Sequence, residues 1–387
     1  IVLAASVLDR SPMSGADFNP SLAQLGISGL GTSFLLFGPD TVESGPYAGT
    51  YTPFQNVPDP SCVANKGILI PQGSGSRCGF VYGPRFNVVN DEDHESMYGS
   101  FKTLLANGNS FEIDYMSTAI DVNDNPQSPS YPALSYLSPA NLIMPGTGGS
   151  PFVVPVMWLG RALGSAFPSP NAPREIETDR LSIGLSGDFD NGFDWDMHYT
   201  ISSEDFYGEQ PDTSTSKFSA AIKGNGGNSG NQTWDLFTPT NNSAGLIKWI
   251  STAQQTWTET ELAVFDFVVT GEWGAMDIAS GFQYRDETFN VARGASSIAQ
   301  FDADGNITVP ADLLFLGGGL ESNASRDAMA VFIEGSINPS EKLEVNGALR
   351  YEDLETDSSI NPKISFRYQA SDNLALRASF STSFREA

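Results

Sequence analysis

Residues 342–353 read KLEVNGALRYED, and their side chains alternate in character with a period of two. One face of an extended strand would carry Leu343, Val345, Gly347, Leu349 and Tyr351, and the other Lys342, Glu344, Asn346, Arg350 and Glu352. Because successive side chains of a strand point to opposite sides, the pattern predicts a strand with one apolar and one polar face.

The same alternation recurs along the chain. It separates Leu374, Leu376, Ala378, Phe380 and Phe384 from Arg377, Ser379, Ser381, Ser383 and Arg385, and Phe193, Trp195, Met197, Tyr199 and Ile201 from Asp194, Asp196, His198, Thr200 and Ser202. We expect ten such strands, near residues 95–105, 110–122, 177–188, 193–206, 259–271, 275–290, 325–337, 342–353, 361–370 and 373–385.

Tight polar turns join these strands in pairs, and longer connections separate the pairs. The turns lie at 107–109, 190–192, 271–274, 338–341 and 371–373, and the connections lie near 123–176, 207–258, 290–325 and 354–360. An outer-membrane barrel has short periplasmic turns and long outer loops, whereas a soluble sandwich has no such constraint. If strands 193–206 and 259–271 both adjoin short periplasmic turns, they must run in opposite directions, so the extended piece 213–224 between them belongs to an outer loop. In the same connection, residues 246–256 show weak helical spacing, which predicts a short helix.

The sequence therefore predicts an all-β fold, an antiparallel transmembrane β-barrel with long extracellular loops. Lipid offers no partner to backbone N–H and C=O groups, so every membrane strand needs a neighbour on both sides. Ten strands with open ends do not meet this condition, and residues 1–13 read as the end of another strand. We expect residues 1–387 to be part of a single barrel domain, with strands missing at both ends.

Composition and cysteine spacing exclude other classes. A formal net charge of -26 repels phosphate backbones, so nucleic acid is not expected as a partner. Cys62 and Cys78 have no nearby His and fit no common zinc spacing, and a disulfide in an oxidising compartment fits better, worth roughly 3 kcal/mol. No run of about 18 apolar residues exists, so we expect no membrane-spanning helix. No signal peptide is recognisable at the start of the sequence, which suggests that the true start of the protein lies upstream.

Catalytic and metal-binding patterns are weak. His94 and His198 are far apart in sequence, and Ser165, Ser186 and Ser203 lack a nucleophile elbow, so we expect no enzyme activity, no catalytic residues and no cofactor. Residues 302–306 and 121–125 have oxygen ligands at calcium-like spacing, but both lack the Glu that closes an EF-hand loop. We interpret them as loop turns and expect no metal site.

Two groups of residues are candidates for ligand contact. Inward polar side chains either touch a plug or ligand or simply line a hydrated lumen, the interpretation we favour: Asp194, Asp196, His198, Arg350, Arg367 and Arg377. Aromatic residues of the long loops either stack on a ligand or, as we favour, pack the loops together: Trp158, Trp234, Trp249 and Trp257. The sequence does not identify the substrate-binding residues.

The C-terminal third resembles the late barrel of TonB-dependent receptors. The resemblance rests on Ala330-Val331-Phe332-Ile333-Glu334, Asn338-Pro339, Leu349-Arg350-Tyr351-Glu352-Asp353, Asn361-Pro362-Lys363 and Leu376 to Arg385. Residues 279–285 resemble the preceding strand, and the stretch from Cys62 to Cys78 resembles a cysteine-bridged outer loop. The chain departs from the family in having Glu386-Ala387 after Phe384-Arg385, and it shows no plug, no TonB-contacting box and no terminal strand.

This resemblance implies a plugged barrel of about 22 strands in the bacterial outer membrane. Its partners would be the lipid bilayer, the TonB complex through the missing N-terminal region, and a scarce small-molecule ligand such as an iron chelate, cobalamin, a saccharide or a peptide. The alternatives are a passive porin-like channel, which would have no plug, and a secreted β-rich adhesion or matrix protein, which would have no lipid-facing band or aromatic girdle.

Overall fold

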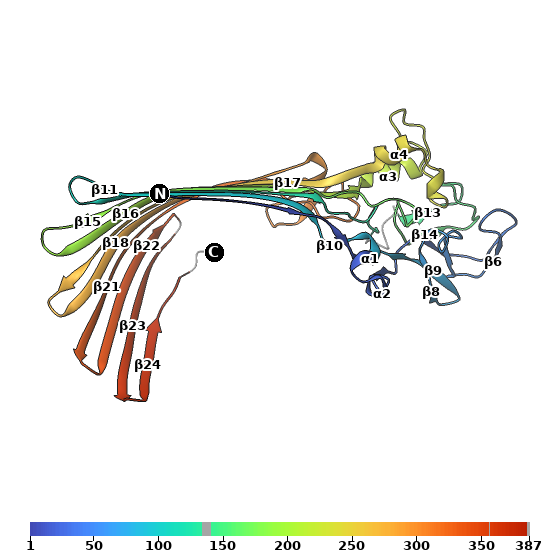
Figure 1. Ribbon diagram of the computed structural model, residues 1–387. Coiled ribbons are helices and arrows are strands. Elements are labelled where there is room, and N and C mark those ends of the chain that lie inside the picture. The colour runs from blue at the N-terminus through green and yellow to red at the C-terminus, as the bar shows by residue number, and fades with distance from the viewer. Residues whose placement is uncertain (134–140, 356, 385–387) are drawn as a thin grey trace.

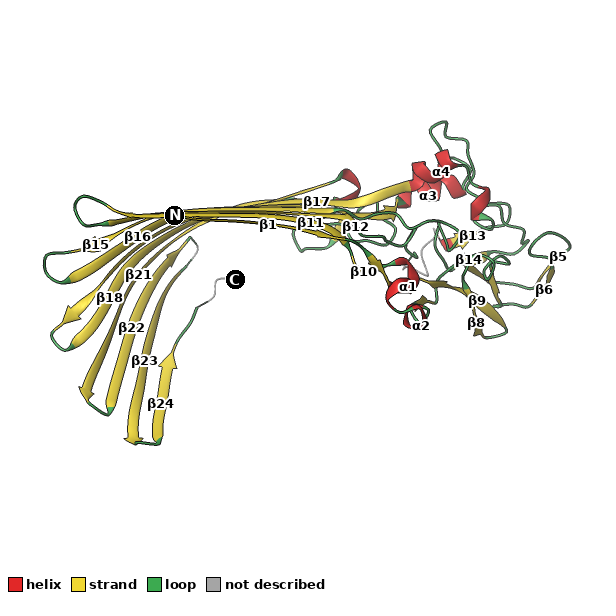
Figure 2. Cartoon of the chain, viewed as in Figure 1, coloured by secondary structure: helices red, strands yellow, loops and turns green. Residues whose placement is uncertain are grey.

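The computed structural model describes residues 1–133, 141–355 and 357–384, and its main feature is a curved antiparallel sheet (Figures 1 and 2). Its eleven strands are, in order across the sheet, β1 (Val2–Arg10), β11 (Asp91–Leu104), β12 (Ser110–Asp124), β15 (Arg174–Asp188), β16 (Phe193–Thr213), β17 (Ser251–Trp273), β18 (Met276–Arg293), β21 (Ser322–Ser340), β22 (Leu343–Leu354), β23 (Ser358–Ser371) and β24 (Leu374–Ser381). All ten predicted strands are present, although position 385 of the last prediction lies outside the described residues. β1 confirms the further strand expected at residues 1–13.

Short turns and long connections lie at opposite ends of this sheet, as predicted (Figure 1). The connections at the loop end are residues 11–90, 125–173, 214–250 and 294–321. The predicted long connection at 354–360 is wrong, because β22 ends at Leu354 and β23 begins at Ser358. Hydrogen bonds between the backbones of Leu354 and Asp357 close a tight turn where the polar composition had indicated a loop.

The cross-strand register aligns the predicted faces over the whole sheet. An unbroken apolar row crosses adjacent strands through Phe111, Leu185, Met197, Phe267, Phe282, Val331, Tyr351 and Ile360. We call the face that carries this row the outer face, and the opposite face, which carries His198 and Arg350, the inner face. Val331 and Tyr351 are 48% and 40% exposed. Burying such a face is worth roughly 25 cal/mol per Å² of apolar surface, so it requires an apolar environment.

Two loop segments adopt a different structure from the one predicted. Residues 213–224 are not extended, because Thr215–Ile222 forms helix α3, capped by Ser214, whose side-chain oxygen accepts a hydrogen bond from the Lys217 amide. The predicted helix at 246–256 begins and ends earlier, as α4 (Ala244–Ile250), and β17 starts at Ser251. None of the helices among the described residues is long and apolar enough to cross a membrane.

The connections 11–90, 125–173 and 214–250 fold together into a globular unit, which we call the cap (Figure 2). A small sheet joins two of them, in the order β13 (Leu142–Ile143), β14 (Val156–Trp158), β4 (Ser33–Leu36) and β7 (Asn56–Pro58). Its core includes Phe34 and Trp158 from this sheet, Phe218 from α3, and Trp234. The described outer loops are therefore packed against one another.

The remaining elements are short and belong to the connections. In the first connection they are β2 (Met13–Ser14), α1 (Gly15–Phe18), α2 (Pro20–Ala23), β3 (Ile27–Ser28), β5 (Asp40–Val42), β6 (Gly49–Tyr51), β8 (Ile68–Gln72), β9 (Gly75–Val81), η1 (Gly83–Arg85) and β10 (Asn87–Val89). Later in the chain they are η3 (Pro239–Asn241), η4 (Ala295–Ser297), β19 (Gln300–Phe301) and β20 (Ile307–Val309).

A charge on the outer face should destabilise the barrel, whereas the same charge on the inner face should not. Ile333 lies on the outer face, and its neighbour Glu334 lies on the inner face. We expect Ile333→Arg in the full-length protein to lower the free energy of unfolding in lipid vesicles by about 2–4 kcal/mol, because a guanidinium must enter hydrocarbon. Denaturant titration measures this loss, and Glu334→Arg is the control. Equal losses in both variants would contradict a lipid-facing outer face.

The cap should lose stability when its core is emptied. Phe34 is fully buried and stacks on Phe237 with ring centroids 4.0 Å apart. We expect Phe34→Ala to cost the cap about 3–5 kcal/mol through lost burial and a residual cavity. Hydrogen exchange resolved by segment should show faster exchange in the cap and unchanged exchange in the main sheet. Phe18→Ala, at a side chain that is 62% exposed, is the control that should leave both unchanged.

Candidate functional site

The inner face holds the polar side chains that the sequence singled out for ligand contact. Cross-strand pairing places Asp194, Asp196, His198, Arg350, Arg367 and Arg377 on this face, so their predicted orientation is confirmed. They do not converge on one point, because they belong to strands at different places in the sheet. Some of them pair locally, since His198 Nε2 lies 3.0 Å from Asp196 Oδ1 and Arg350 Nη2 donates to Glu352 Oε1 at 2.9 Å.

A hollow of about 620 Å³ lies against the inner face toward the short-turn end. Four carboxylates and one lysine line it: Asp194, Glu272, Asp277, Glu334 and Lys363. Its position shows that the inner face is the concave face of the sheet. The mixed polar lining agrees with the interpretation that we favoured from the sequence, in which these side chains line a hydrated lumen.

A second hollow, of about 220 Å³, lies on the same face directly beneath the cap. Arg174, Phe206, Gln210, Gln254 and Thr256 supply its wall from β15, β16 and β17, and Gln127 reaches it from the second connection. This arrangement combines a guanidinium, amide groups and an aromatic ring at the mouth of the lumen with one carboxylate, Glu209, which accepts hydrogen bonds from Tyr207 and Gln255. Such a set can hold an oxygen-rich or anionic ligand by hydrogen bonds and stacking.

Hydrogen bonds fix the amide groups of this second hollow. The Tyr131 hydroxyl donates to Gln127 Oε1 at 3.0 Å and accepts from Gln210 Nε2 at 3.0 Å, and the Tyr131 ring stacks on Phe315 at 4.7 Å. Burial raises the pKa of Tyr131 above its ordinary value. Arg174, in contrast, forms no ion pair with any described residue, so its guanidinium is available to a ligand.

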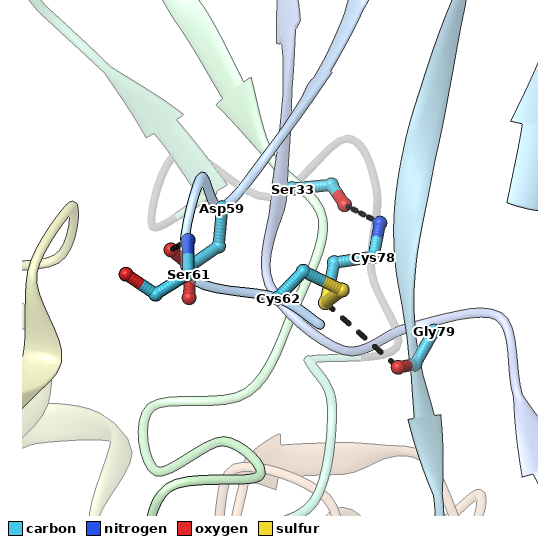
Figure 3. Close-up of a disulfide and its surroundings, with 6 residues drawn as sticks. All are labelled: Ser33, Asp59, Ser61, Cys62, Cys78 and Gly79. Atoms are coloured by element: carbon cyan, nitrogen blue, oxygen red, sulfur yellow. Dashed lines mark hydrogen bonds between the residues drawn. A yellow bond between two sulfur atoms is a disulfide. The ribbon is translucent and has the colours of Figure 1, made fainter. Parts of the chain in front are cut away.

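The predicted disulfide lies in the cap (Figure 3). Cys62 and Cys78 are bonded at an S–S distance of 2.04 Å and are almost fully buried, so this prediction is confirmed. The Cys78 amide donates to the Ser33 hydroxyl at 2.8 Å, which attaches the bridged loop to β4. A Cβ at Gly67 would come within 2.8 Å of the Cys62 sulfur, so only glycine fits beside the bridge.

A buried arginine connects separate segments of the cap. The Arg161 guanidinium donates to the Leu30 carbonyl and the Ser128 hydroxyl, both at 2.8 Å, and to the Ser130 carbonyl at 2.6 Å. It also lies over the Phe80 ring, 4.3 Å from the centroid. Burial lowers the pKa of Arg161 to about 10. The cap is therefore built on a polar clamp as well as on an apolar core.

The fourth connection is attached to the same end of the sheet by carboxylates. The buried Asp212 side chain accepts hydrogen bonds from the amides of Phe315 and Leu316, at 3.0 and 2.8 Å. Asp312 accepts from the Ser216 amide at 2.7 Å, and such hydrogen bonds outweigh the opposing effect of burial and lower its pKa. These contacts place residues 294–321 beside the second hollow.

Most of the aromatic residues predicted in the loops pack the loops together. Trp158 and Trp234 are fully buried in the cap core, and Trp249 packs against that core, so the packing interpretation is confirmed for these three. Trp257 was misplaced, because β17 is longer than expected and carries it as a strand residue, stacked on Tyr207 at 5.2 Å.

The weak chemical motifs form no common site. Residues 302–306 form the turn between β19 and β20, where the Asp302 carboxylate accepts from the amides of Asp304 and Asn306. Residues 121–124 are not a turn but the end of β12. Ser165 is in the cap, whereas Ser186, Ser203 and His94 belong to β15, β16 and β11. The described residues contain no group of three or more His, Cys, Asp or Glu side chains placed to hold a metal ion.

Sequence reasoning missed the second hollow. Arg174 and Phe206 sit at strand ends that were assigned too short, because β15 and β16 continue beyond the predicted boundaries of 177 and 206. The available signal was a period of two in which the acidic Glu175, Glu177 and Asp179 alternate with Ile176 and Thr178, weaker than the apolar alternation of the strand centre but continuing it outward. Gln127 carries no such signal, since only the folded connection brings it to the sheet.

Comparison with known proteins identifies the family. The TonB dependent receptor-like β-barrel family matches residues 86–387, which is most of the chain. No curated protein sequence matches the chain. Many solved structures do, at low sequence identity.

Three of these structures illustrate the range. The ferric preacinetobactin receptor BauA from Acinetobacter baumannii is 10% identical with a TM-score of 0.39, over 74% of this chain and 39% of the receptor. The ferric-catecholate import receptor Fiu from E. coli K12 is 11% identical with a TM-score of 0.43, over 77% and 48%. FpvA of P. aeruginosa, bound to heterologous pyoverdines, is 12% identical with a TM-score of 0.43, over 75% and 35%.

This chain thus spans less than half the length of each of the three receptors. The family match covers every main-sheet strand except β1, and it agrees with the alternating faces and with the long connections at one end. The chain belongs to the TonB-dependent receptors and comprises part of their β-barrel.

Proposed function

We propose that this chain is part of the barrel wall of an outer-membrane receptor that takes up a scarce ligand by energised transport. Members of its family are outer-membrane β-barrels of Gram-negative bacteria, and they are transporters rather than enzymes. The observation that carries the proposal is the continuous apolar row across the outer face, opposite an inner face that carries charged and amide side chains such as Asp266, Gln283 and Glu334. Iron chelates, cobalamin, saccharides and peptides are the candidate ligand classes.

Closure of the barrel requires strands beyond those described. β1 and β24 are the two free edges of the sheet. They are the first and the eleventh strand of an antiparallel order, so they run in the same direction. A second copy would therefore pair its β1 in parallel with β24, whereas bacterial outer-membrane barrels are antiparallel with an even number of strands. We infer that an odd number of strands of a longer protein closes the barrel, around a plug that contacts TonB.

Ligand capture is assigned to the second hollow, beneath the cap. The hollow opens onto the lumen side, and its guanidinium has no ion-pair partner among the described residues. The cap borders it through Gln127, and the fourth connection borders it through the contact of Gln254 with Gly317. A ligand held there lies at the entrance of the polar inner face, along which it would pass when the plug moves.

Transport should be induced by scarcity and driven by energy. In a strain carrying the full gene, we expect depletion of one ligand class to raise the level of the protein, because the receptor serves a scarce substrate. Uptake of that radiolabelled ligand should stop when a protonophore collapses the inner-membrane gradient. Uptake that continues with the protonophore and rises linearly with concentration would instead identify a passive channel.

Arg174 should contribute to capture of the ligand found by that depletion screen. We expect Arg174→Gln to weaken equilibrium binding by roughly tenfold, the factor that one lost charge-assisted hydrogen bond of about 1.4 kcal/mol gives. Arg180→Gln is the matched control, because Arg180 lies on the same strand and face but outside the hollow. Titration calorimetry on the full-length protein measures both, and equal effects would remove the hollow from the binding site.

A further inference from the structure

A small cavity lies in the cap beside the Cys62–Cys78 disulfide, where Figure 3 shows Asp59 and Ser61. It shares no residue with either hollow of the inner face. Its volume is about 40 Å³, which leaves room for an ion and a water molecule, since a single water needs roughly 10–15 Å³. Its polar lining includes Thr32, Asp59, Ser61 and Asn65 from the first connection, Ser165 from the second and Thr240 from the third.

The wall of this cavity carries a buried hydroxyl group without a partner. Thr32 is 4% exposed, and its hydroxyl forms no hydrogen bond with any described residue. A Cβ added at Gly164, which also lines the cavity, would lie 3.1 Å from Thr32 Oγ1 and otherwise in open space among the described residues. The Thr32 hydroxyl therefore faces the cavity. Because a buried polar group without a hydrogen bond destabilises a fold, this oxygen indicates a bound species in front of it.

The half-buried Asp59 carboxylate brings a negative charge to the same cavity. Its Oδ1 accepts a hydrogen bond from the Ser61 amide at 2.8 Å, and it forms no ion pair with any described residue. Burial raises the pKa of Asp59 above its ordinary value. The side chains of Ser61, Asn65 and Thr240 form no hydrogen bond with described residues either, so neutral oxygen atoms surround the carboxylate. A desolvated carboxylate in such surroundings is stabilised by a cation.

We propose that this cavity binds one monovalent metal cation, held by the Asp59 carboxylate, the Thr32 hydroxyl and the neighbouring neutral oxygens. Carboxylate, hydroxyl and amide oxygens are the ligands that hard cations prefer. One carboxylate balances a single positive charge, whereas the described residues contain no group of three or more His, Cys, Asp or Glu side chains placed to hold a metal ion of higher charge. The bound cation joins the three connections and stabilises their packing in the cap.

Hydrogen exchange resolved by segment tests the site in the full-length protein. Exchange is compared in NaCl, KCl and choline chloride at equal ionic strength, with EDTA present, because the choline cation is too large for the cavity. We expect the cap to exchange roughly tenfold more slowly in NaCl or KCl than in choline chloride, the effect of a free cation at about ten times its dissociation constant. Exchange in the main sheet should be the same in all three salts.

Two substitutions remove the site in different ways. Asp59→Asn removes the charge and keeps an acceptor for the Ser61 amide, whereas Gly164→Ala places a methyl group in front of the Thr32 hydroxyl without backbone strain. Both should abolish the difference between the salts while leaving exchange in choline chloride unchanged, which shows that the cap is folded. Asp40→Asn is the matched control that should keep the difference, because Asp40 is a buried carboxylate of the cap outside the cavity.

Three results overturn the inference. Equal exchange of the cap in all three salts excludes a bound monovalent cation. Protection of the cap that appears only when Ca²⁺ or Mg²⁺ replaces EDTA identifies a divalent site instead. A difference between the salts that persists in either variant places the cation elsewhere in the protein. Each of these results leaves the transport proposal standing, since that proposal depends on the two faces of the main sheet and not on this cavity.

Discussion

A hydrocarbon environment that offers no hydrogen-bond partner is the constraint on which the rest of this structure depends. It requires each backbone N–H and C=O of a membrane strand to be paired with a neighbour, and it requires every second side chain to be apolar. The main sheet meets the second requirement along the row of paired residues that crosses it from Phe111 to Ile360. Each internal strand of the described sheet has a hydrogen-bonded neighbour on both sides, whereas β1 and β24 each have a neighbour on one side.

The same period of two provides the polar lining. Because alternate residues must leave the outer face, each strand contributes charged and amide side chains to the concave inner face, and the hollow beneath the cap arises where this face meets the folded connections. A disulfide and the Arg161 clamp hold the cap together, and the Asp212 carboxylate of β16 attaches the fourth connection to the sheet. Under the proposed function, the strands form the wall of the passage and the connections lie at its entrance.

The strands could be predicted from the sequence because their signal is local: a residue such as Leu349 is apolar for the same reason as its neighbours two positions away. Strand ends were underestimated at Arg174 and at Ser251, because above the membrane both faces meet water and the alternation fades. The cap could not be predicted, since Phe34, Trp158 and Trp234 come together only through tertiary packing of three connections. The disulfide could be predicted because cysteine spacing and redox chemistry leave few alternatives for the two cysteines. The hollow that we assign to ligand capture could not be predicted, because Gln127 and Arg174 are brought together only by the fold.

The alternation of lipid and water along one strand can be measured directly. Spin labels placed one at a time at positions 343–353 of the full-length protein in a bilayer report the local accessibility of oxygen and of a water-soluble nickel complex. A lipid-facing outer face predicts high oxygen accessibility at Leu343, Val345, Leu349 and Tyr351, and nickel accessibility at the positions between them. Odd-numbered positions shielded from both reagents, as in the interior of a soluble protein, would contradict it.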